Sequence, residues 1–129
     1  KNLKFRLNFF FYKINKKFKL IKEKIRIQKL DNFNLKPDLI KIDTEGSELD
    51  VIKSSLKTIK KYKPLIIVEF NHTNFLNIKK ILIKLDYKDY IYEKKNFKII
   101  NKKIIDEIAK RTNLTNIIFA KTELKLNSN

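Results

Sequence analysis

Acidic side chains follow two short apolar runs of this 129-residue chain. Leu39–Ile42 leads directly into Asp43 and Glu45, and the run 65–68 leads into Glu69. Carboxylates in such positions can bind a divalent cation, accept hydrogen bonds from hydroxyl or amino groups of a ligand, or act as a general base. They could equally form ion pairs with lysine or accept bonds from backbone amides, so the residue types leave both interpretations open.

Two residue types that occur only once lie beside these acids. Gly46, the only glycine, follows Glu45. A glycine is expected there if the backbone has a positive φ or if another group approaches closely, although an ordinary tight turn needs glycine too. His72, the only histidine, comes shortly after Glu69. A proton-transfer group would be useful at that strand end, but a histidine in a loop can also be a plain surface residue.

The apolar patterns around these residues predict a strand, a helix and a second strand. The run 39–42 predicts a short buried strand, and the run 65–68 lacks alternation, which is typical of a strand buried on both faces. One helix, capped by Ser47, is expected after Gly46, and its apolar stripe repeats at three- and four-residue spacing. The stripe consists of Leu49, Ile52, Leu56 and Ile59. Such a unit implies a right-handed parallel crossover, which would bring Asp43, Glu45 and Glu69 to one edge of the sheet.

Further elements are expected on both sides of this unit. The alternation at 24–30 predicts a half-buried strand before it. The elements expected after it are a helix from Thr73 or Asn74 to about Leu85, strands at 87–93 and 97–100, a helix at 103–111 and a strand at 116–120. The fold class expected is α/β, in a three-layer Rossmann-like arrangement with parallel strands near 38–43 and 65–70 and antiparallel strands near 87–93 and 116–121.

The composition gives 31 Lys and Arg against 14 Asp and Glu, a net charge of +17. Such a charge can attract nucleic acid, anionic lipid or an acidic polymer, or it can simply reflect lysine on every solvated surface. Cysteine is absent, which excludes disulfides and thiolate metal sites and is compatible with the cytoplasmic location that we expect. No apolar run approaches the roughly 20 residues that span a bilayer, so no membrane span is expected.

The block D-L-I-K-I-D-T-E-G-S-E at 38–48 and the stretch K-P-L-I-I-V-E at 63–69 resemble a known family. Both are similar to blocks of the FkbM-type methyltransferases, which depend on S-adenosylmethionine. The segment L-D-N-F at 30–33 and the strand at 116–119 resemble further elements of that family, so that the resemblance covers about 24–121. It implies a methyltransferase, often an O-methyltransferase of sugar-containing substrates, with a small-molecule or saccharide acceptor.

Carried over to this sequence, the family's signature residues are Asp43, Glu45, Gly46 and Glu48, with Glu69 as the acid that ends the next strand. We expect Asp43, Glu45, Glu69 and His72 to be the catalytic residues. Asp43 and Gly46 are expected to bind the donor, and no metal ligand is assigned.

One departure from the family pattern changes the expectation. Such methyltransferases hold S-adenosylmethionine mainly with a glycine-rich loop after the first strand and an acid after the second. No glycine precedes Gly46, and residues 1–23 resemble neither element. We therefore expect a C-terminal half-domain at 24–121, inactive alone, after a basic and aromatic segment at 1–23 and before a flexible tail at 122–129.

Two other functions compete with this interpretation. A non-enzymatic module could bind RNA or another anionic polymer through residues 1–29, because basic and aromatic residues alternate there as they do in single-strand binders. A metal-dependent phosphotransfer site could use Asp43, Glu45 and Glu69. Neither alternative accounts for the ordered series of family-like elements, and the sequence does not indicate an oligomeric state.

Overall fold

A five-stranded sheet forms the centre of the computed structural model, which describes residues 24–110 and 115–125. The strands are β1 Leu39–Ile42, β2 Leu65–Glu69, β3 Lys88–Glu93, β4 Asn96–Ile99 and β5 Asn116–Ala120. The helices are α1 Glu48–Ser54, α2 Leu56–Tyr62, α3 His72–Ile83 and α4 Lys102–Ala109, with a 3-10 turn at Leu30–Asn32. The α/β class is therefore confirmed, while the expectations for residues 1–23 and 126–129 lie outside the described residues.

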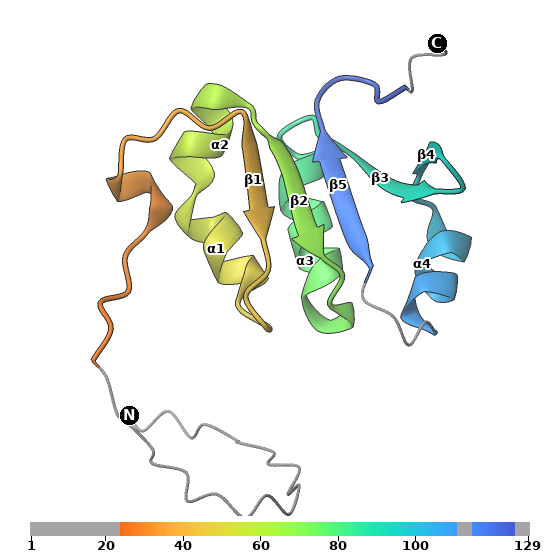
Figure 1. Cartoon of the computed structure of the whole chain (residues 1–129), viewed down its shortest axis with the longest axis horizontal. Coiled ribbons are helices and arrows are strands. Elements are labelled where there is room, and N and C mark those ends of the chain that lie inside the picture. Colours follow the sequence, from red (N-terminus) through yellow and green to blue (C-terminus); the bar gives the residue numbers. More distant parts are fainter. Residues whose placement is uncertain (1–23, 111–114, 126–129) are drawn as a thin grey trace, which may run out of the picture.

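The strand order is β1-β2-β5-β3-β4 (Figure 1). β1 and β2 pair in parallel, as predicted, and β5 is antiparallel to both of its neighbours, β2 and β3. β3 and β4 form a hairpin whose two turn residues, Lys94 and Lys95, have φ values of 49° and 58°. Positive φ at both central residues suits the right-handed twist of paired strands. The last of the described strands, β5, thus lies inside the sheet and not at its edge.

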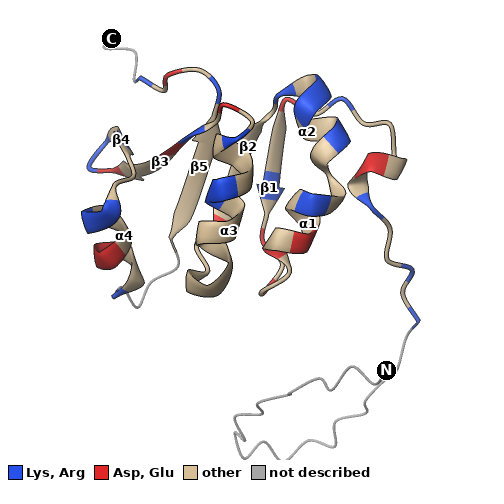
Figure 2. Cartoon of the chain, turned by 180° about the vertical axis from the view of Figure 1, so that it is seen from behind, with Lys and Arg blue, Asp and Glu red and all other residues tan. Residues whose placement is uncertain are grey.

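Helices α1, α2 and α3 cover one face of the sheet (Figures 1 and 2). Ile66 and Val68 of β2 are buried toward them, whereas Leu65 and Ile67 on the other face are only half-buried. The expectation that β2 is buried on both faces was therefore wrong for the described part of the chain. A three-layer arrangement would need helices on both faces of the sheet. The helices within residues 24–110 and 115–125 all pack on the same face, so these residues form two layers.

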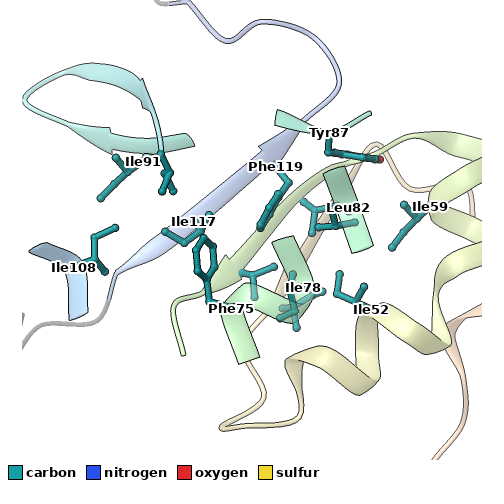
Figure 3. Packing of buried hydrophobic residues seen from close by; sticks show 14 residues of the cluster. Ile52, Ile59, Phe75, Ile78, Leu82, Tyr87, Ile91, Ile108, Ile117 and Phe119 are labelled. Carbon is teal, nitrogen blue, oxygen red and sulfur yellow. The ribbon is translucent and has the colours of Figure 1, made fainter. Parts of the chain in front are cut away.

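The core is a single cluster of aliphatic and aromatic residues between this face and the helices (Figure 3). Phe75, Ile78 and Leu82 of α3 point inward, as their spacing predicts. Ile117 and Phe119 of β5 are fully buried opposite them. The side chains meeting here are Ile42, Ile52, Ile59, Ile66, Val68, Phe75, Ile78, Leu82, Tyr87, Ile91, Ile100, Ile108, Ile117 and Phe119.

The strand expected at 24–30 is absent. Residues 24–29 have no regular secondary structure, and Ile25 and Ile27 are 79% and 89% exposed. An alternating pattern stabilises a strand only when a neighbouring strand accepts its hydrogen bonds, and none of the described strands pairs with this segment.

The single helix expected after Gly46 is divided into α1 and α2. Ser55, at φ −115° and ψ 6°, ends α1, and its hydroxyl donates to the Val51 carbonyl at 2.6 Å. The first free amides of α2, those of Lys57 and Thr58, donate to the Asp31 carboxylate at 3.1 and 2.9 Å. An acid 26 and 27 residues away therefore caps α2. Ser47, the expected cap of α1, makes no such side-chain bond.

Asp31→Ala should lower the free energy of unfolding by about 1 kcal/mol at pH 7, the usual cost of losing a helix cap. Burial alone raises the pKa of Asp31, but the Thr58 and Lys57 amides outweigh it and lower the pKa. Stability from Asp31 is therefore present above the ordinary aspartate pKa and lost as the pH falls through the lowered one. Urea unfolding at neutral and acidic pH measures this. A loss that did not shrink in acid would contradict the capping role, and the exposed Asp38→Ala serves as control.

Candidate functional site

Three carboxylates meet at the end of β1 and β2. The register pairs Ile42 with Val68, so the next residues, Asp43 and Glu69, leave the sheet side by side. Asp43, Glu45 and Glu69 each offer an oxygen atom, and these atoms all lie within 4.8 Å of one another. Asp43 and Glu45 are exposed, and Glu69 is half-buried. The parallel pairing thus gathers the three acids that the sequence singled out.

Two of these acids act as one titrating pair. A hydrogen bond from Glu69 lowers the pKa of Asp43, and Lys41 lowers it further through a hydrogen bond and its charge. The pKa of Glu69 is raised, first by the hydrogen bond with Asp43, then by burial and by the negative charges of Asp43 and Glu45. Two negative charges this close disfavour each other, so the Glu69 carboxyl releases its proton at a higher pH than the Asp43 carboxyl does.

Lys41 connects the acids to the neighbouring strand. Its ammonium group lies 3.4 Å from Asp43 and donates to the Asn116 side chain at 2.7 Å, reaching across β2 to β5. Asn116 is the register partner of Glu69. The Lys41 ammonium group and the Asn116 amide therefore lie beside Asp43 and Glu69, on the sheet face opposite α1, α2 and α3.

The turn after Asp43 has an unusual backbone. Glu45 and Gly46 have φ values of 50° and 108°. A left-handed conformation costs a non-glycine residue roughly 1–2 kcal/mol, so Glu45 must be held there by its surroundings. A Cβ on Gly46 would meet nothing within 4 Å, so the positive φ, and not close approach by another group, calls for glycine.

Glu48 supplies the contacts that hold this turn, a role that the sequence analysis missed. Only 2% of the residue is exposed. Its Oε1 atom accepts hydrogen bonds from the amides of Gly46 at 2.8 Å and Thr44 at 3.3 Å, and from the Thr44 hydroxyl at 3.2 Å. The position of Glu48, two residues after the only glycine, was the only feature of the sequence that pointed to this role. Spacing alone does not show that its carboxylate accepts hydrogen bonds from the preceding turn.

A shallow cavity of about 250 Å³ opens beside the acids. It is lined by Glu45, Gly46, Glu48, Glu69, Phe70 and Asn71. His72 is not among these residues; it is exposed, begins α3, and its ring lies edge-on to Phe70 with centroids 6.4 Å apart. A larger cavity of about 440 Å³ lies on the sheet face opposite α1, α2 and α3, and its lining includes Lys41, Asn116, Ile67 and Ile118. It adjoins the acids through Lys41 and Asn116 but is lined by none of them.

Fold and site together define an α/β protein with a cluster of acids at the carboxyl ends of two parallel strands, the edge at which open α/β sheets bind ligands. A family model described as the methyltransferase FkbM domain matches residues 7–98, well over half of the chain. The chain therefore belongs to the FkbM methyltransferase family, as the blocks at 38–48 and 63–69 indicated. The matched range begins within the basic segment 1–23 and ends in β4. Neither a curated protein nor a solved structure matches the sequence.

Asp43→Asn should lower the pKa of Glu69 toward its ordinary value. The substitution removes the charge of Asp43, and an asparagine amide can donate to the Glu69 carboxylate, which favours its ionised form. A pH titration of the side-chain carboxyl carbons by NMR measures the shift. An unchanged Glu69 titration would contradict the coupling between the two carboxyl groups, and Asp50→Asn, at an exposed position of α1, is the matched control.

Proposed function

We propose that this chain is part of an S-adenosylmethionine-dependent O-methyltransferase and carries the acidic half of its active site. The observation that supports this most strongly is the position of the family block. Its acids Asp43 and Glu45 lie within 4.8 Å of Glu69, at the edge where open α/β sheets bind ligands. A sugar-containing small molecule is the proposed acceptor, since its hydroxyl groups suit a cluster of carboxylates.

The roles follow from the chemistry of these residues. S-adenosylmethionine, when bound, supplies an activated methyl group. Methylation of a hydroxyl oxygen releases its proton, and the Asp43–Glu69 pair can take up that proton once Glu69 is ionised. Glu45 can accept hydrogen bonds from acceptor or donor hydroxyl groups, and the turn at Gly46 brings backbone close to the same cavity. His72, exposed at the start of α3, is proposed as a secondary proton acceptor.

We propose that the described residues supply only part of the donor site. The cavity of about 250 Å³ at the acids is smaller than the roughly 300–1,000 Å³ of typical ligand pockets, and the adjoining cavity of about 440 Å³ is lined by none of the three acids. The sequence also has no glycine before Gly46 with which a backbone loop could approach the donor. We therefore propose a partial, Rossmann-like methyltransferase domain in which other residues must complete the donor site.

The chain alone should give no measurable heat of binding when titrated with S-adenosylmethionine in a calorimeter, because the proposed partial domain lacks most donor contacts. Measurable binding would contradict the proposal of a partial domain. Magnesium and manganese are titrated in parallel, since micromolar binding of either would favour the metal-dependent alternative for Asp43, Glu45 and Glu69.

Asparagine in place of the aspartate that corresponds to Asp43 should strongly reduce turnover in a complete FkbM-family enzyme. If this carboxylate takes part in proton uptake, kcat should fall by about 10²–10⁴-fold. Steady-state kinetics with the enzyme's own acceptor measure the change. Unchanged kcat and KM would reject the role, and the acid that corresponds to the exposed Asp50 is the control.

The RNA-binding alternative depends largely on residues 1–23, which lie outside the described residues, and we do not favour it. The helices of the described chain are all too short or too polar to cross a membrane. We propose the cytoplasm as the location of the protein.

A further inference from the structure

The buried carboxylate of Glu48 links two segments that are far apart in the sequence. Its Oε1 atom holds the turn between β1 and α1 through the Gly46 and Thr44 amides. Its Oε2 atom accepts a hydrogen bond from the Asn74 side chain at 3.4 Å. The same Asn74 amide donates to the Gly46 carbonyl at 2.8 Å. One asparagine of α3 therefore contacts both the turn and the residue that shapes it.

Asn74 lies in α3, the helix that follows Glu69 in the sequence. Glu69 ends β2, and only Phe70 and Asn71 separate it from α3, which begins at His72. The first turn of α3 is itself fixed, because the Asn71 side chain accepts from the Thr73 amide at 3.0 Å. A bond from Asn74 to Gly46 thus joins the loop that carries Asp43 and Glu45 to the loop after Glu69.

The electrostatic state of Glu48 agrees with this geometry. Burial by itself raises the pKa of Glu48, but hydrogen bonds from the Gly46 amide, its own amide, the Asn74 side chain and the Thr44 amide outweigh burial and lower it. The carboxylate is consequently charged at neutral pH although the residue is buried. A charged acceptor makes stronger hydrogen bonds than a neutral one, which suits a group that must hold a left-handed turn.

We propose that Glu48 and Asn74 are positioning residues for the acidic site, holding Asp43 and Glu45 at their distance from Glu69. Glu48 fixes the turn, and Asn74 fixes the turn relative to α3. Neither residue needs to touch the substrate. Their assignment to a methyltransferase site rests on the proposed function, whereas their effect on the spacing of the acids does not.

Because Gly46 is the only glycine of the chain, the contact between Gly46 and Glu48 can be followed by NMR in the full-length chain. Labelling with ¹⁵N-glycine gives one backbone amide signal, that of Gly46, whose N–H donates to Glu48. This signal should move with pH as Glu48 titrates. Asn74→Ala should raise the pKa seen at Gly46, because Glu48 loses a donor. Glu48→Gln should abolish this pH-dependent movement while leaving a single signal.

The titration of Glu69 is the readout that separates positioning from a merely structural role. Asn74→Ala changes no charge, yet it should lower the Glu69 pKa toward its ordinary value if Asp43 moves away. Asn74→Ser, which suits the first turn of a helix, gives the same test if the alanine variant does not fold. The exposed Asn77→Ala on the same helix should change neither titration.

The two possible failures are distinguishable. A Glu69 titration that is unchanged in folded Asn74→Ala or Asn74→Ser overturns the proposal, even if the variant loses stability. These measurements need neither methyl donor nor acceptor. Unchanged kcat and KM after the Asp43-equivalent substitution in a complete FkbM-family enzyme would therefore count against the proposed function and leave the positioning role standing.

Discussion

The parallel register of β1 and β2 is the constraint on which the site depends. Ile42 pairs with Val68, so the residues that follow each strand, Asp43 and Glu69, must emerge together. Parallel strands need a crossover, and α1 and α2 supply it by packing Ile52 and Ile59 against the sheet. Burial of these apolar side chains thus sets the separation of two carboxylates that would otherwise repel each other.

The site also shows how a strongly basic chain arranges its few acids. With 14 acidic residues against 31 basic ones, any single acid could have formed an ordinary surface ion pair. Asp43 does contact Lys41, but Asp43 and Glu69 also share a hydrogen bond, and Glu48 is buried against backbone amides. Asp43, Glu69 and Glu48 therefore form hydrogen bonds with one another or with backbone amides. This distinguishes the region from the lysine-rich helix surfaces in Figure 2.

Much of the fold could be predicted because the information is local. The β-branched runs and the spacing of Phe75, Ile78 and Leu82 specify strands and a helix wherever a core exists to receive them. The errors arose where a distant residue decides the outcome. The alternation at 24–30 found no partner strand, and α2 begins as a separate helix at a carboxylate from Asp31. The position of β5 between β2 and β3 also depends on pairing across the whole chain.

The sequence by itself determined the family, the acids at the two strand ends and the glycine that the turn requires. Those features depend on residue types and on short spacings, both of which are visible directly in the sequence. Only the tertiary structure decided that Asp43 raises the pKa of Glu69, that His72 lies outside the acidic cavity, and that Glu48 and Asn74 hold the turn. These outcomes depend on distances of a few ångströms between groups 26 or more residues apart, or on the direction in which a side chain turns, and neither is encoded in the order of residues alone.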